Sequence, residues 1–598
     1  MKTQSKHSKP IQRRQQHSPK GRVHRRGCLM PLIGSAAFVA IIAIALASAA
    51  TPISDEPQVK QKSTLSNLMS QAQVESLADK YKAGLAKGKP VDPAALAAAI
   101  KSSSLRPVAT PHLKETWQSE GGVVLQWTKR SDAEGFTLYR SCDGEIWEQL
   151  AQLGADTRYY CDREVEGGVE YHYALVATST ADGLRNSDHS RLEQRVYLSS
   201  PALNVSKRKT KAQISWKNAR AATGYTVEYA SNMFFIGAKT LVIGDASTLS
   251  ASVSGLSKDK PCYARIRAEH SDGASVSYAT WSYSSNMTEG KTAKLSQAKT
   301  KKKVKVKKGK KKKTKTVAFE LRRTAKQKVG GCDTLQGSCA GGGYGFFVLN
   351  DRNTDKNKIV KVKLDGMKVV KVSKTLAIHH ANDLTYNSKT GQIIAVHSTG
   401  DQRGLSVIDA RTLKIKKTVT IKKSVATLFD ASEAGFKKIS GITSIAYNAK
   451  RDCYIGTIRG THDMLELDAN FKATRVVALS AKSKGVYQNI EVGNDVIAVS
   501  TSANAEQGGN YLWLYSWSGK FLCKVLIPQA HELEGVFLKG NKLYAGFYVS
   551  GQKEKTKTIT STRYEKTSSG KTVAKKTKRR VKVTVITRDN YLYKVSGI

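Results

Sequence analysis

Two short stretches of this 598-residue chain gather side chains that bind metals or transfer protons. HHANDLTYN begins with His379 and His380 and continues to Asn382 and Asp383, and HELEGVFLKGN begins at His531. Imidazole, amide and carboxylate groups are the usual ligands of zinc and calcium. The stretches are either the halves of one site or the product of a repeated fold that places polar residues at equivalent positions.

The second explanation has support, because segment 314–598 is a loose internal repeat. Its units begin about 45 to 60 residues apart, and each predicts four short strands separated by turns. This pattern predicts a β-propeller with five blades. The last unit lacks a fourth strand, and an isolated strand at 316–322 precedes the first unit. We expect 316–322 to pair with 591–595 and close the ring, which would remove two exposed edges.

Alignment of the units puts one polar residue of each at the start of the innermost strand. Innermost strands line the channel of a propeller, so these side chains should converge near one mouth. Such a ring either holds water or binds a ligand or a hard cation such as Ca²⁺. His379, His380 and His531 lie just upstream and are weak candidates for a metal site, while Asp383 could point into its own blade. The aligned residues are Gln336, Asn382, Thr443, Asn489 and Glu534.

The run QGSC, GYGFFVL, KIVKVKL, HHANDLTYN and VIDARTL resembles a family of uncharacterised exported propellers from Gram-positive bacteria. That resemblance implies no established reaction. A more distant likeness is to calcium-dependent lactonases, which place Glu, Asn and Asp around a channel metal. Glu534, Asn382 and Asn489 match that set in residue type only. We therefore expect no enzyme activity and no cofactor, with a metal-dependent hydrolase as the alternative.

Two segments before the repeat, 107–199 and 200–292, alternate apolar and polar residues in short runs typical of small β-sandwiches. Both resemble fibronectin type III domains, which implies a spacer or binding module. The resemblance rests on a tryptophan in the second strand, a tyrosine in the third and a tyrosine at the start of the sixth. These residues are Trp127, Trp216, Tyr139, Tyr229, Tyr171 and Tyr263.

The N-terminal region predicts export. Residues 1–27 carry nine Lys or Arg and no acid, and the segment 28–50 is apolar and long enough to span a bilayer. The basic flank should remain cytoplasmic, which places the C-terminal part outside the cell. Segment 28–50 is either a retained single-pass anchor or a cleaved signal peptide, after which the protein would be secreted and wall-associated. Residues 51–106 have apolar positions at helical spacing and predict a stalk.

The formal net charge of +50 predicts binding to polyanions. Export and the absence of nucleic-acid-binding motifs favour cell-wall polymers or a membrane surface over specific nucleic acid. Twelve of the seventeen residues 299–315 are lysine. The region 293–313 is either a solvated linker or a wall-binding strap. Residues 550–583 predict a second basic segment, a long hairpin or loop in the last blade.

Seven cysteines lie outside the apolar run. Cys142 with Cys161, and Cys332 with Cys339, are candidate disulfides, whereas the odd total argues against a complete disulfide framework. Cys262, Cys453 and Cys523 are expected to be buried thiols.

Together these features predict a mainly β, modular surface protein: two fibronectin type III-like sandwiches and a five-bladed propeller behind an N-terminal transmembrane helix and short stalk. The expected function is binding or adhesion through the basic segments. A cation-dependent site at the propeller mouth is the alternative.

Overall fold

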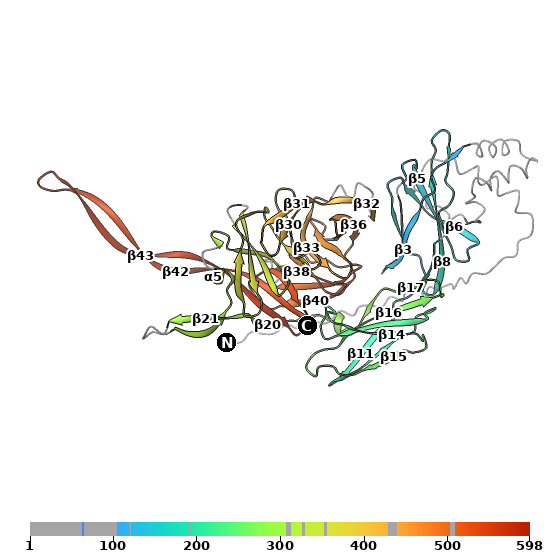
Figure 1. Cartoon of the computed structure of the whole chain (residues 1–598), viewed down its shortest axis with the longest axis horizontal. Coiled ribbons are helices and arrows are strands. Elements are labelled where there is room, and N and C mark those ends of the chain that lie inside the picture. The colour runs from blue at the N-terminus through green and yellow to red at the C-terminus, as the bar shows by residue number, and fades with distance from the viewer. Residues whose placement is uncertain are drawn as a thin grey trace, which may run out of the picture.

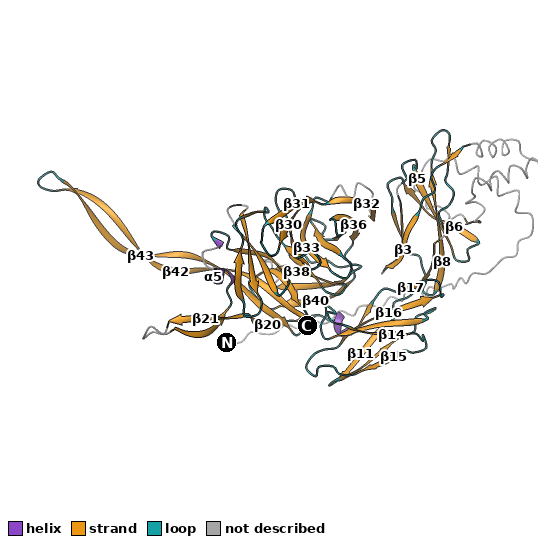
Figure 2. Ribbon diagram, viewed as in Figure 1, coloured by secondary structure: helices purple, strands orange, loops and turns teal. Residues whose placement is uncertain are grey.

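The computed structural model describes residues 62–64 and 105–598, except 120, 129, 192, 306–311, 326–328, 352–353, 355, 429–438 and 503–508. Within these residues the fold is mainly antiparallel β-sheet, with two short helices, α4 (Ser285–Thr288) and α5 (Leu321–Ala325) (Figure 2). None of the described helices is long and apolar enough to cross a membrane. The expected membrane segment 28–50 and nearly all of the expected stalk lie outside the described residues. Lys62–Thr64, inside the expected stalk, is strand β1 and pairs with β6.

The first sandwich consists of two sheets, one of order β1-β6-β5-β8-β10 and one of order β3-β4-β7. Trp127 is fully buried between them against Phe136. The Tyr171 hydroxyl accepts a hydrogen bond from the Glu166 amide at 2.8 Å, which is the tyrosine corner expected from the sequence. The strands are β2 (Arg106–Pro107), β3 (Leu113–Ser119), β4 (Gly122–Trp127), β5 (Gly135–Ser141), β6 (Ile146–Gly154), β7 (Tyr159–Asp162), β8 (Val169–Thr178), β9 (Leu184–Arg185) and β10 (Glu193–Tyr197).

The second sandwich repeats this plan with sheets of order β11-β12-β15 and β14-β13-β16-β17, where β18 also pairs with β16. Trp216 is buried against Tyr225 in its core. Tyr263, in contrast, packs outside that core against residues from the C-terminal half of the chain. The strands are β11 (Leu203–Arg208), β12 (Lys211–Trp216), β13 (Gly224–Ala230), β14 (Lys239–Ile243), β15 (Ser250–Val253), β16 (Tyr263–Ser271), β17 (Val276–Tyr278) and β18 (Ser282–Tyr283).

The C-terminal half is a propeller-like ring of five sheets (Figure 1). The innermost strands of the five sheets are β23, β28, β33, β37 and β41. Each contacts the innermost strand of the next sheet, and contact between β23 and β41 closes the ring. The strands are β23 (Thr334–Gly341), β24 (Tyr344–Asn350), β25 (Lys356–Lys363), β26 (Lys368–Val372), β27 (Leu376–Ala377), β28 (Leu384–Asn387), β29 (Gln392–Val396), β30 (Gly404–Asp409), β31 (Ile415–Thr420), β33 (Ile442–Asn448), β34 (Cys453–Ile458), β35 (Met464–Leu467), β36 (Lys472–Val477), β37 (Val486–Val492), β38 (Val496–Ser502), β39 (Asn510–Ser516), β40 (Phe521–Ile527), β41 (Glu532–Lys539), β42 (Lys542–Lys566) and β43 (Thr572–Ser596).

The strand that completes the fifth sheet differs from the expected one. β20 (Lys294–Gln297) pairs with β43 from Tyr593 to Ser596, so the outer strand comes from the residues that directly follow the second sandwich. Within the expected 316–322, only Glu320 bridges Tyr591. Two further strands lie parallel on outer edges, β19 (Lys291–Thr292) on β40 and β32 (Lys422–Leu428) on β36. The described residues of region 293–313 are therefore mostly β-strand rather than an extended linker.

The second sandwich and the ring share one apolar core. Met233, Phe234 and Phe235, from the loop after β13, are buried with residues of β38, β39, β41 and β42. The Asn494 amide donates to the Phe234 carbonyl at 2.8 Å, and a β-carbon at Gly493 would lie 2.5 Å from the Phe234 β-carbon. This sandwich is thus docked on the ring and is no loose spacer.

Candidate functional site

Three of the five aligned polar residues occupy the same backbone feature. Gln336, Thr443 and Glu534 each fall in a register shift of an innermost strand, between the paired residues on either side. A bulge leaves one extra residue without a cross-strand partner and turns its side chain away from the regular alternation. The predicted equivalence of these three positions therefore matches the structure.

Asp383, rather than an aligned residue, is the polar group at the centre of the ring. Its carboxylate is fully buried and accepts hydrogen bonds from the Leu384 amide (2.7 Å), the Ile445 amide (3.1 Å) and the Ile490 amide (3.2 Å). It also accepts from the Asn489 side-chain amide. The idea that Asp383 points into its own blade is wrong, because these donors belong to three innermost strands. Burial raises the pKa of Asp383 well above its ordinary value, against the opposing effect of the donors.

Asn489 belongs with Asp383 and is displaced by one residue from its predicted place. The register shift in β37 spans Tyr487 to Ile490, so Gln488 takes the aligned position. The Asn489 side-chain oxygen accepts from the Val536 amide at 2.8 Å, just as Asp383 accepts from Ile445 and Ile490. These side chains tie neighbouring blades together through backbone amides.

Asn382 has a similar bridging role. Its side-chain amide donates to the carbonyls of Thr443 and Gln488, both at 3.1 Å. Near the axis there is little free space, since a β-carbon at Gly337 would lie 2.7 Å from the Asp383 Cα atom. The polar atoms of Asn382, Asp383 and Asn489 are therefore used to hold strands together, which accounts for much of HHANDLTYN.

The three histidines are not arranged as a metal centre. His380 Nε2 lies 2.6 Å from Gln336 Oε1, His379 packs against His397 with ring centroids 5.0 Å apart, and His531 is exposed. Among the described residues, no group of three or more His, Cys, Asp or Glu side chains is placed to hold a metal ion. The suggestion that His379, His380 and His531 bind a metal together is not supported. Glu534 is 1% exposed and thus closed off from solvent.

The expected disulfides are absent, and all seven cysteines of the described region are thiols. Cys332 lies just before β23 and Cys339 lies within it, so about seven extended residues, or about 20 Å, separate them. A disulfide needs Cα atoms within about 7 Å. Cys142 is exposed at the end of β5, whereas Cys161 lies in β7 of the other sheet. Cys262, Cys453 and Cys523 are buried thiols, as expected.

Both basic segments form hairpins that project from the same side of the ring (Figure 1). The shorter one joins β21 (Lys299–Lys305) to β22 (Lys312–Ala318). Its root is fixed to the ring because the Ala298 amide donates to the Leu592 carbonyl of β43 and the Phe319 amide donates to the Ala298 carbonyl. The lysine-rich segment thus has a defined strand pairing at its base.

The longer hairpin, here called the arm, comprises the parts of β42 and β43 beyond the ring. β41 pairs with β42 only as far as Tyr548, after which β42 and β43 pair with each other from Val549↔Asp589 to Lys566↔Thr572. At about 3.3 Å per residue, these eighteen pairs extend about 60 Å. Residues 550–583 carry twelve Lys or Arg and two Glu, which leaves a net charge of +10. Of the two predicted forms of residues 550–583, a long hairpin or a loop, the structure has the hairpin.

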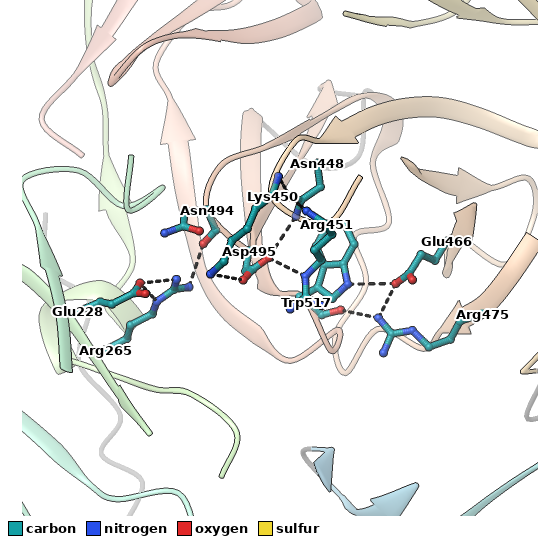
Figure 3. A network of polar contacts seen from close by, with 10 residues as sticks. All are labelled: Glu228, Arg265, Asn448, Lys450, Arg451, Glu466, Arg475, Asn494, Asp495 and Trp517. Carbon is teal, nitrogen blue, oxygen red and sulfur yellow. Dashed lines mark hydrogen bonds and ion pairs between the residues drawn. The ribbon is translucent and has the colours of Figure 1, made fainter. Parts of the chain in front are cut away.

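A buried polar network at the sandwich–ring junction was not predicted from the sequence (Figure 3). Arg265 of β16 is 0% exposed, donates to Glu228 at 2.9 Å and to the Asn494 carbonyl at 2.9 Å, and lies over the Trp281 ring at 4.5 Å. The adjacent Asp495 is paired with Arg451 at 2.7 Å. Buried charges need such partners, so this network helps to position the second sandwich on the ring.

Comparison with known proteins gives matches to solved structures alone, all of low identity and low TM-score. No protein-family model and no curated protein matches the sequence. A two-domain fibronectin type III segment of chicken tenascin is 16% identical, with a TM-score of 0.18, and the match covers 29% of this chain and 96% of that one. A structure of a nidogen/laminin complex is 9% identical, with a TM-score of 0.25, and the match covers 36% of this chain and 72% of that one. Kuenenia stuttgartiensis hydrazine synthase is 9% identical, with a TM-score of 0.24, and 37% and 56% are covered.

Proposed function

We propose that this chain is a non-enzymatic surface protein that binds anionic polymers of a cell wall through its two basic hairpins. Residues 28–50 would hold it at the outer face of the membrane, or export it if they are cleaved. The docked sandwich and ring would then serve as a rigid base for the hairpins.

The observation that carries the proposal is the arm. A two-stranded ribbon outside a sheet is only marginally stable in water, and this one extends about 60 Å with a net charge of +10. Every described side chain from Glu554 to Thr572 is exposed. Repulsion between its cations opposes the folded ribbon, so an anionic polymer that neutralises them would both bind the ribbon and stabilise it.

The shorter hairpin supports the same function. It carries twelve lysines in residues 299–315, with no acid, and it is attached to β43, the strand from which the arm also extends. Two basic hairpins that are attached to the same strand can contact one polymer at two places, which raises the effective affinity.

The test is to shorten the arm in the full chain by joining Gln552 to Ile586, which are paired in register, through an Asn-Gly turn. Binding of fluorescent poly(glycerol phosphate) is then measured at low salt for both proteins. We expect the affinity to fall by about tenfold or more. An unchanged affinity, with an unchanged melting temperature of the ring, would refute the proposal.

A further inference from the structure

The strand register sorts the side chains of the arm onto two different faces. Directly opposite residues of an antiparallel pair lie on the same face, and successive residues alternate. One face, called the threonine face, therefore has a row of threonines from β42 beside a row of cations from β43. The pairs are Thr556↔Lys582, Thr558↔Arg580, Thr560↔Lys578 and Thr562↔Lys576.

The opposite face, called the valine face, is built differently. Lys555 pairs with Val583, Lys557 with Val581, and Ile559 with Arg579. Val581 and Val583 are half-buried, whereas the threonines of the other face are exposed. The valine face thus combines apolar groups with its cations. Farther along this face, Glu565 lies 3.7 Å from Lys575 and partly neutralises its charge.

The threonine face offers the more regular array of donors. Its four cations follow one strand at every second residue, which spaces them by about 7 Å. Among the described residues, Lys576, Lys578 and Arg580 form no ion pair with a carboxylate, while Lys582 lies 3.4 Å from Glu554. Threonine hydroxyls beside ammonium and guanidinium groups are suitable donors to phosphate oxygens.

We propose that the threonine face is the binding face of the arm and that its ligand is a flexible, linear polymer with about one phosphodiester per 7 Å. This inference rests on the proposed function and specifies its ligand class and binding residues. A flat membrane is a poorer match. The ribbon twists along its length (Figure 1), so the cation row winds around the axis and a flexible polymer can follow it.

The apolar groups of the arm also disfavour a membrane as the ligand. Its exposed large hydrophobic residues are Ile559, Tyr564 and Val573. Tyr564 lies on the threonine face and the other two lie on the valine face, as the register requires. Insertion at a membrane surface needs a continuous apolar face, which these scattered residues do not provide.

The experiment compares two triple variants of the full chain that remove the same charges. The threonine-face variant is Lys576→Gln, Lys578→Gln and Arg580→Gln, and the valine-face variant is Lys555→Gln, Lys557→Gln and Arg579→Gln. Each loses two lysines and one arginine from exposed positions. Binding of labelled poly(glycerol phosphate) is measured against salt, and equal melting temperatures show that both variants fold.

We expect the threonine-face variant to lose about tenfold in affinity and the valine-face variant less than about threefold, because exposed charge contacts contribute modestly and only one set is engaged. Equal losses would overturn the face assignment and leave the proposed function in place. The face assignment would also be overturned if neither triple variant lost affinity while shortening of the arm abolished binding. If the shortened arm binds normally, the proposed function itself fails.

A competition experiment distinguishes the two sources of phosphodiester groups, a linear polymer and a membrane surface. Vesicles that contain phosphatidylglycerol present the same headgroup on a surface. We expect them to displace the labelled polymer poorly when compared at equal phosphate concentration with unlabelled polymer. Displacement by vesicles as effective as that by polymer would overturn the assignment of a linear ligand.

Discussion

The buried carboxylate of Asp383 should be a major source of stability for the ring. It accepts hydrogen bonds from the amides of Leu384, Ile445 and Ile490 and from the Asn489 side chain, and it is fully buried. Asp383→Ala leaves four buried donors without this acceptor. At about 1 kcal/mol or more for each, the free energy of unfolding should fall by about 4 kcal/mol. That is a large part of the 5–15 kcal/mol typical of a folded domain.

A matched control is available in the same blade. Asp409 accepts hydrogen bonds from its own turn, among them those from the amide and the hydroxyl of Thr412. Asp409→Ala should therefore cost about 1 kcal/mol or less. Urea unfolding followed by tryptophan fluorescence measures both changes, with Trp513 and Trp517 reporting on the ring. If Asp383→Ala costs no more than Asp409→Ala, the view that Asp383 ties three blades together is wrong.

Three further predictions concern burial and charge. Burial raises the pKa of Glu491 from 4.5 to about 7, so the folded state binds the proton of this group more tightly than the unfolded state does. The free energy of unfolding should therefore fall as the pH rises from about 4.5 to 7. Glu491→Gln should remove that part of the pH dependence, as measured by urea unfolding at several pH values. Arg265→Met should destabilise the sandwich–ring junction by about 3 kcal/mol because Glu228 is left buried without its partner, which differential scanning calorimetry would detect as earlier unfolding of the second sandwich. Cys142 is exposed and should react with a thiol reagent in the native protein. Burial raises the pKa of Cys523 to about 12 and should keep this thiol unreactive until the ring unfolds. Equal labelling rates of the two cysteines would contradict this prediction.

The repeats were predictable because alternation of apolar residues and turn spacing depend on local sequence. Trp127 and Trp216 are buried where the sandwich pattern placed them, and the paired strands of the arm follow from its β-branched residues. Gln336, Thr443 and Glu534 fall at equivalent register shifts for the same reason. Asn489 was displaced by one because the register shift in β37 is longer than those in β23, β33 and β41.

Long-range pairing was the part that sequence did not reveal. β20 is a four-residue strand beside a lysine-rich run, and nothing in its composition distinguishes it from the later 316–322 as the closing strand. The docked loop did carry a signal, since Met233, Phe234 and Phe235 form an apolar run between two strands of a sandwich. Such a run in a loop indicates burial against another unit, and here that unit is the ring.

The most direct test of the central claim is the salt dependence of polymer binding by the full chain. If the basic hairpins bind an anionic polymer, log K for poly(glycerol phosphate) should fall linearly with log salt, with a slope of roughly −0.7 for each phosphate contacted. Shortening the arm should make that slope shallower. An affinity that does not change with salt, or a slope that is the same with and without the arm, would contradict the account.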